Sequence, residues 1–187
     1  MTGKRKTAGA KSGCNCILTL TTRQYELDGV GLFTDDCGDY DGEPLDAPGD
    51  DSDSGVIEMV TEAAVAVKGG RLTVSYDETE ITGLGESRTE ISFALDDPTV
   101  ISVMRTGEVR TALVIEQGVR HICTYETPVM PFEICTYARK ATNSVTVDGG
   151  EMHLDYIVEI RGALAQRTVL DVTLRKADAA SYNGENI

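Results

Sequence analysis

The chain has 187 residues, of which 41% are apolar and 26% are charged, so it can bury one core and is not a disordered protein overall. Its formal net charge of -14 and isoelectric point near 4.5 argue against nucleic acid as a partner, because phosphate backbones are bound by clustered Lys and Arg. Neither a secretory apolar region nor an apolar run of about 18 residues is visible, which predicts a cytoplasmic protein that does not enter a membrane.

The first part of the chain contains a tail, a strand and an acidic stretch. Residues 1–13 are basic and lack periodicity, which predicts a flexible tail. CILTLTTRQYEL at 16–27 is short, β-branched and partly alternating, as is typical of a strand. Residues 34–55 hold nine of the 31 acidic residues and no basic one, which predicts a solvated acidic loop.

Two strands joined by a hairpin are predicted next. In VIEMVTEAAVAVKGG at 56–70, apolar side chains recur at every second position, while Glu58 and Glu62 point the other way. RLTVSYDETEIT at 71–82 alternates in the same manner, and the Lys-Gly-Gly junction favours a tight turn between them. The alanine-rich segment at 61–68 could form a helix by propensity, but the alternation around it favours a strand.

The rest of the chain repeats this pattern. ESRTEISFAL at 86–95 predicts one strand, and residues 99–128 predict three more, separated by Thr-Gly and Gln-Gly turns. Residues 130–176 predict a further three, separated by glycine-containing turns. Residues 177–187 have no periodicity, which predicts a second flexible tail.

Together these elements predict an all-β fold. About ten short strands joined by tight turns form an antiparallel meander, which we assign to a single domain at 14–176. A meander must protect its edges, either by closing into a barrel or by splitting into a sandwich. Because consecutive hairpins close without long crossovers, we predict a calycin-like or lipocalin-like barrel of about 8–10 strands.

The acidic loop and the cysteines do not predict a metal site. A calcium loop of the EF-hand type has Gly at its sixth position and a closing carboxylate at its twelfth. With Gly55 in the sixth position, Thr61 falls at the twelfth. Cys14 and Cys16 are separated by one residue, whereas zinc sites usually separate paired cysteines by about two to four. We therefore expect neither a metal nor another cofactor.

No spacing in the sequence places a nucleophile beside a base, so an enzyme is the least favoured reading. His153 lies on the polar face of a predicted strand and is expected to be exposed, whereas the position of His121 is ambiguous. The GLG segment at 83–85 precedes a strand and is too short for a phosphate loop. Cys123 and Cys135 are expected as small buried side chains.

The alternation of the strands predicts polar side chains inside the barrel. If the apolar faces point inward, so do Tyr76, Arg105, Tyr125, Thr136 and Tyr156. A buried Arg needs an opposite charge, which Glu78, Glu80, Glu126 or an anionic ligand could provide. In the alternative interpretation, Arg105 lies at a strand end near the mouth of the barrel and is solvated.

Four segments between residues 75 and 175 form an ordered set of motifs. They are SYDETEITGLGES at 75–87, VMRTGEV at 103–109, RHICTYETP at 120–128 and LDYIVEIRGALAQRTVLDVTLR at 154–175. The set resembles the YwiB-like family, which are bacterial proteins of unknown function, and the first strand also fits that family. The resemblance implies a calycin-type β-barrel and no established activity.

The sequence therefore favours a protein that binds a small ligand, which could be anionic, in the interior or mouth of a barrel. Arg105 would pair with a carboxylate or phosphate, and the tyrosines would contribute ring contacts and hydroxyl groups. The alternative is a protein-interaction or structural module with a barrel filled by side chains. A polar, open cavity would favour the ligand, whereas a filled lumen with an exposed apolar patch would favour the module.

Overall fold

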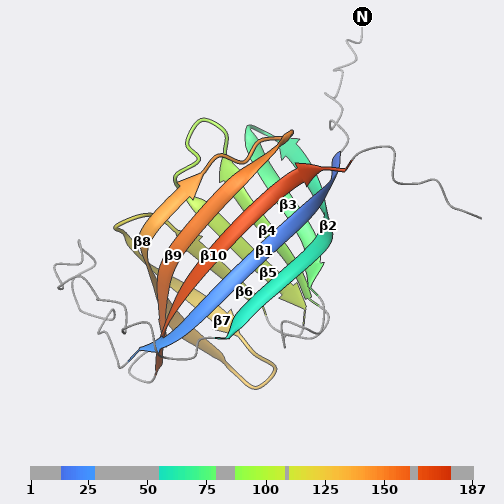
Figure 1. Cartoon of the computed structure of the whole chain (residues 1–187). Helices are drawn as coiled ribbons and strands as arrows, with labels where there is room; N and C mark the ends of the chain where they lie inside the picture. The colour runs from blue at the N-terminus through green and yellow to red at the C-terminus, as the bar shows by residue number, and fades with distance from the viewer. Residues whose placement is uncertain (1–13, 28–54, 79–86, 108–109, 161–163, 178–187) are drawn as a thin grey trace, which may run out of the picture.

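The computed structural model describes residues 14–27, 55–78, 87–107, 110–160 and 164–177, and every regular element in these ranges is a strand. The ten strands wrap around a common axis (Figure 1). Their bounds are β1 Cys14–Leu27, β2 Val56–Lys68, β3 Arg71–Glu78, β4 Ser87–Ala94, β5 Ile101–Gly107, β6 Arg110–Ile115, β7 Arg120–Glu126, β8 Pro131–Asn143, β9 Gly149–Ile160 and β10 Leu164–Lys176.

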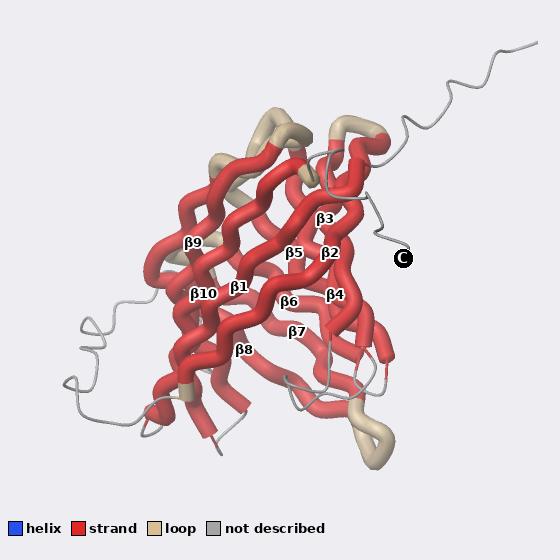
Figure 2. Tube along the Cα trace, turned by 45° about the vertical axis from the view of Figure 1, so that its right-hand side comes forward, coloured by secondary structure: helices blue, strands red, loops and turns tan. Residues whose placement is uncertain are grey.

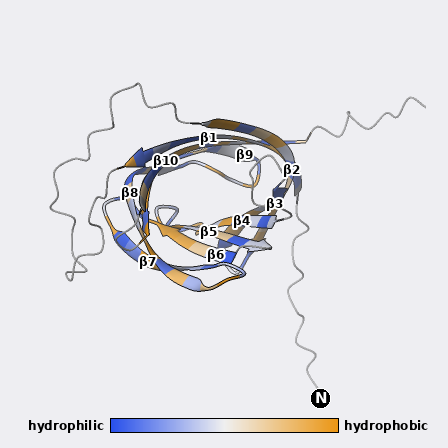
Figure 3. Cartoon of the chain, turned by 90° about the horizontal axis from the view of Figure 1, so that it is seen from below, coloured by the Kyte–Doolittle hydropathy of each residue, from blue (hydrophilic) through white to orange (hydrophobic). Residues whose placement is uncertain are grey.

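The strands form one closed antiparallel barrel. Each strand pairs with its neighbours in sequence, and β1 pairs with β10 to complete the ring. Figure 3 looks along the barrel from below and shows this ring of strands. Closure pairs both edges of the sheet, which removes the exposed edges of an open meander. The predicted all-β barrel is confirmed, and the helical alternative for 61–68 is wrong because that segment lies within β2.

Among the described residues, short turns connect β2 to β3, β7 to β8 and β8 to β9, as the sequence predicts (Figure 2). Gly69 and Gly70 link β2 to β3 with φ angles of +59° and +77°, a region that glycine adopts without steric cost. The β7–β8 turn is held by the Thr127 hydroxyl oxygen, which accepts a hydrogen bond from the amide of Met130 at 3.2 Å. These local signals mark where β2 and β7 end.

One half of the lumen, toward the β2–β3 hairpin, is packed with apolar side chains. Alternation along each strand sends every second residue inward, as in β3, where the even-numbered residues are buried. Burying a large aliphatic or aromatic side chain contributes roughly 1.5–3 kcal/mol, so this half stabilises the barrel. Its most buried members include Leu18, Leu72, Phe93, Ile101, Ile115 and Leu154.

The contact between β6 and β7 is the shortest in the ring. In the described part of the chain, β6 is in register with β7 only at Arg110 and Thr111. Beyond them the Gly118 amide donates instead to the Ala138 carbonyl of β8 at 2.9 Å. β8 itself has a bulge between Ala138 and Lys140. Strands β6 and β7 therefore separate beyond Thr111, and the segment that follows β6 is hydrogen-bonded to β8 instead.

Several features predicted from the sequence lie outside the described residues. They are the tail at 1–13, the acidic loop at 34–55 apart from Gly55, the GLG segment at 83–85 and the tail at 177–187 apart from Ala177. Among the residues that are described, no helix is long and apolar enough to cross a membrane.

Candidate ligand-binding site

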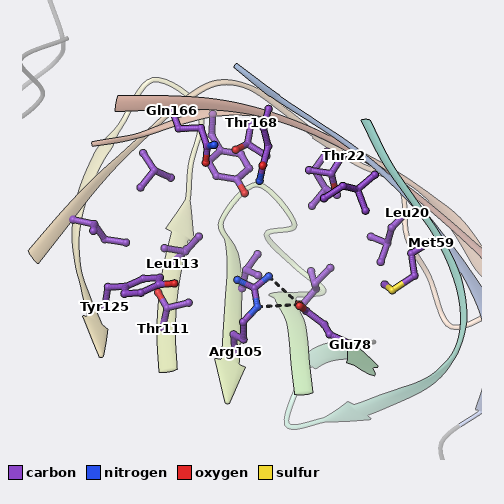
Figure 4. A pocket seen from close by; sticks show the side chains of 18 of the residues that line it. Leu20, Thr22, Met59, Glu78, Arg105, Thr111, Leu113, Tyr125, Gln166 and Thr168 are labelled. Carbon is purple, nitrogen blue, oxygen red and sulfur yellow. Dashed lines mark hydrogen bonds and ion pairs between the residues drawn. The ribbon is translucent and has the colours of Figure 1, made fainter. Parts of the chain in front are cut away.

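The other half of the lumen encloses a cavity of about 510 Å³. All ten strands contribute to its wall, which mixes apolar and polar side chains (Figure 4). The apolar side chains include Leu20, Met59, Leu113, Val158 and Leu170. A concave site of this size with a few convergent polar groups is the usual form of a small-molecule site.

Direct register between strands explains how polar side chains from separate strands meet in this cavity. Residues opposite each other in an antiparallel pair point to the same face of the sheet. One row of such partners crosses five consecutive strands, and its members are Tyr76, Thr89, Arg105, Thr111 and Tyr125. If one member points inward, the whole row points inward.

Arg105 and Glu78 form a shielded ion pair on this wall (Figure 4). The Arg105 Nε and Nη2 atoms lie 2.9 and 2.8 Å from the same oxygen, Oε1 of Glu78. The Thr89 hydroxyl donates to that oxygen as well, at 2.5 Å. The Glu78 side chain is 2% exposed and that of Arg105 is 24% exposed. Partial exclusion of water strengthens charge-assisted hydrogen bonds of this kind.

The structure decides which partner neutralises Arg105. Glu78 does so, whereas Glu126 pairs with Arg110 at 3.4 Å and Glu80 lies outside the described residues. Arg105 does lie near a strand end, two residues before the end of β5, but the interpretation of its side chain as solvated is wrong, because the side chain is paired and mostly buried. An anionic ligand is therefore not needed to balance its charge.

Two polar atoms of the cavity wall are buried without a hydrogen-bond partner among the described residues. They are Oε2 of Glu78 and Oγ1 of Thr111. A buried polar group without a partner costs about 1–3 kcal/mol. Such groups are uncommon in packed cores, and those that occur require an explanation such as a functional role.

The tyrosines bring neutral hydroxyl groups to the cavity. Tyr156 of β9 is in register with Thr168 of β10, and Thr168 lies across the cavity from Arg105 (Figure 4). Burial raises the pKa of Tyr156, although the charge of Arg105 and a hydrogen bond with Thr168 oppose this. Burial, and then the charge of Glu78, raise the pKa of Tyr76 as well. Both hydroxyls therefore keep their protons near neutral pH.

Tyr125 lines the same cavity, and its ring contacts a second aromatic ring of the wall. Its ring stacks on that of Phe132 with centroids 5.0 Å apart and an interplanar angle of 25°. Offset stacking of this type adds to the energy of burial. Tyr76, Arg105, Tyr125 and Tyr156 thus line one cavity, and their contact with a ligand stays a prediction.

Thr136 does not line the cavity. Its side chain is buried, and its hydroxyl donates to the carbonyl oxygen of Val114 at 2.8 Å and lies 3.4 Å from that of His121. Val114 belongs to β6 and His121 to β7, so Thr136 joins the two strands where their own pairing has ended. These contacts are with neighbouring strands, and contact of Thr136 with a ligand stays a prediction.

Both histidines contact a carboxylate. His153 Nδ1 lies 2.6 Å from Asp171, whose other carboxylate oxygen accepts a hydrogen bond from Arg23 at 3.1 Å. The hydrogen bond with His153 holds the pKa of Asp171 below its usual range. His121 Nε2 lies 3.0 Å from Glu116. His153 lies on the face opposite Met152 and Leu154, as expected, but it is paired with Asp171 and only 33% exposed.

The cysteines that the structure describes are mostly core residues. Cys16, Cys123 and Cys135 are buried, which confirms the burial predicted for the last two. No group of three or more His, Cys, Asp or Glu side chains within the described ranges is arranged to hold a metal ion.

Sequence reasoning missed several polar residues of the cavity wall, among them Gln166 and Thr168 of β10. A signal was present, because Leu170, Val172 and Leu174 continue the same alternation inward along that strand. It was overlooked because Gln166 and Thr168 precede the apolar residues of this face, and polar residues in that place resemble the exposed start of a strand. Register with Tyr156 shows that this end also faces the cavity.

Residues 48–172 match the family described as a domain of unknown function, DUF1934. The chain belongs to this family. The crystal structure of the ywiB protein from Bacillus subtilis is similar, with a TM-score of 0.66 and 17% identity over 90% of this chain and 95% of that one. At this identity the likeness shows a shared fold. No curated protein matches the chain. The resemblance to the YwiB-like family is confirmed, and a relationship to calycins stays a prediction.

Proposed function

We propose that this barrel binds a small molecule in the cavity around Arg105. The observation that carries the proposal is the cavity itself, about 510 Å³ in volume and lined by residues of every strand. Ligand sites typically occupy roughly 300–1,000 Å³ and combine apolar walls with a few fixed polar groups. Barrels of about eight or more strands can hold one small ligand in their interior.

The lining suits a ligand with an apolar body and one polar end. Leu20, Met59 and Leu170 line the cavity together with the Arg105–Glu78 pair. Apolar contact would supply most of the affinity, and the polar groups would fix the orientation. Because Arg105 and Glu78 already hold each other in place, the site is organised before a ligand arrives, which lowers the entropic cost of binding.

A protein-interaction or structural module is the second candidate. Val129 and Met130 at the tip of the β7–β8 turn are 89% and 62% exposed, and exposed apolar side chains favour a protein partner. However, this reading predicts a lumen filled by side chains. The cavity favours the ligand over the module.

Uptake of the neutral fluorescent dye N-phenyl-1-naphthylamine tests the proposed function. We expect the wild-type protein to bind it with a rise in fluorescence and Leu113→Trp to lose this binding, because Leu113 lines the cavity. Ile122→Trp is the matched control, since Ile122 is exposed. Val158→Trp, also in the lining, replaces Leu113→Trp if that variant does not fold.

The proposal fails if the wild type does not take up the dye, or if the cavity variant binds it as well as the control does. A cavity variant that is also more stable than the wild type, with no uptake in either, would instead support a structural barrel whose lumen is merely underpacked.

A further inference from the structure

At the polar end of the cavity, the charges of Arg105 and Glu78 cancel, and this determines which kind of ligand can bind there. We infer that it takes an uncharged ligand with a carboxamide-type edge, in which a carbonyl oxygen lies beside an N–H, and discriminates against carboxylates. This inference rests on the proposed function, because it names the ligand class of the same site.

Arg105 keeps part of its guanidinium group for a ligand. The group carries five N–H donors in a rigid plane, and Glu78 takes one edge through Nε and Nη2. In the described part of the chain, Nη1 has no partner, although the side chain is mostly buried. Figure 4 shows the guanidinium directed into the cavity with Glu78 at its side. An oxygen acceptor is the group that this free edge would bind.

The acceptor should carry no charge. Glu78 cancels the charge of Arg105 within the wall, and its carboxylate is almost fully buried. A ligand carboxylate at the free edge would bring a second negative charge next to the first in a poorly solvated space. Like charges placed together in such a space are strongly unfavourable. A carbonyl oxygen accepts the same hydrogen bonds without that repulsion.

The unpartnered oxygen of Glu78 favours a donor beside the carbonyl. Oε2 is buried and makes no hydrogen bond to a described residue, whereas Oε1 accepts two hydrogen bonds and also forms the ion-pair contact with Nη2 of Arg105. Because Oε2 is itself covered by protein, a ligand N–H next to the carbonyl would not bond to it but would lie on this side of the pair and offset its negative potential. The hydroxyls of Tyr156 and Thr168 line the cavity and are neutral, so they are compatible with an uncharged ligand and add no cation that would attract an anion.

Three probes with the same octyl chain separate these possibilities: octanamide, octanoate and octylamine. Each is titrated at neutral pH against the protein loaded with N-phenyl-1-naphthylamine, and displacement of the dye is measured. We expect octanamide to bind at least about tenfold more tightly than octanoate, because the carboxylate meets Glu78. Octylamine is expected to be weaker as well, since the free edge of Arg105 repels a cation.

Glu78→Gln tests the cause of this preference. Removing the carboxylate leaves Arg105 without a counterion, so the ranking should reverse and octanoate should become the tightest probe. Arg105→Met replaces this variant if Glu78→Gln does not fold, and it should make octylamine the tightest probe. The variant Glu62→Gln, which changes a charge on β2 at a residue outside the cavity lining, should keep the wild-type ranking.

The outcomes separate this inference from the proposed function. If the dye binds but the wild type prefers octanoate or octylamine, does not distinguish the probes or binds none of them, the inference is overturned and the proposed function stands. The inference is also overturned if Glu78→Gln keeps the wild-type ranking. If neither the dye nor any probe binds, both fall together.

Discussion

The two halves of the lumen are built by the same ten strands and yet differ in what fills them. Toward the β2–β3 hairpin, Leu72, Phe93 and Ile101 are at most 1% exposed and pack into a continuous apolar core. In the other half, the inward positions of the same strands carry Tyr76, Glu78 and Arg105 around a cavity. The difference teaches that the packed half stabilises the barrel, which lets the other half hold buried polar groups at a cost to stability.

The largest expected loss of stability is that of a Phe→Ala substitution in the packed half, and the same substitution beside the cavity provides the comparison. Phe93→Ala should reduce the free energy of unfolding by about 3–5 kcal/mol, because it opens a cavity in close-packed surroundings. Phe132→Ala should cost about 1–2 kcal/mol, since Phe132 is only partly buried and already borders a cavity. Urea denaturation measures both values, and equal losses would contradict the comparison.

The next effect concerns the ion pair. Arg105→Met leaves the Glu78 carboxylate buried without its cation and should cost about 3 kcal/mol at neutral pH. Glu78→Gln should cost less, because Arg105 is more exposed than Glu78. The double variant should be more stable than Arg105→Met alone, since it removes both charges. Denaturation of the three variants gives the coupling energy, and strictly additive losses would show that the pair is not energetically coupled.

Replacing Gly150 tests the turn between β8 and β9, which lies at the packed end of the barrel. The φ of Gly150 is +138°, and a Cβ atom there would lie 2.8 Å from the Cα of Val145, a core residue. Gly150→Ala should therefore lower the free energy of unfolding by about 2 kcal/mol through strain and displacement of the turn. Gly55→Ala is the control, because a Cβ at Gly55 meets nothing within 4 Å. Equal melting temperatures for both variants would argue against a strained turn.

The smallest effect is expected at Thr136, which joins the diverging strands β6 and β7. Thr136→Val removes the hydrogen bond to the Val114 carbonyl and should cost about 1 kcal/mol. Amide hydrogen exchange should become faster in β6 and β7 while dye binding stays unchanged, because Thr136 is not part of the cavity wall. Thr124→Val, on the exposed face of β7, should alter neither. A loss of dye binding in Thr136→Val would place this residue in the site after all.

Much of the fold could be predicted because its signals are local. Apolar alternation marks nearly every strand, and glycines such as Gly69 and Gly118 mark the turns between them. The candidate site could be predicted only in part. Alternation indicated that Tyr76, Arg105 and Tyr156 face inward, but it also included Thr136, which uses its hydroxyl to join two strands. Alternation reports the face of a residue and not its height in the barrel or its hydrogen-bond partner.

The sequence by itself determined the strands, their turns and the inward direction of the polar residues, because these depend on neighbours within one strand or hairpin. Only the tertiary structure decided that Arg105 pairs with Glu78, which is 27 residues away and reaches it across β4. Closure of the ring also decided that Thr168, which is in register with Tyr156, lies across the cavity from that pair (Figure 4). Such contacts depend on the register and curvature of the whole barrel, which no single stretch of sequence specifies.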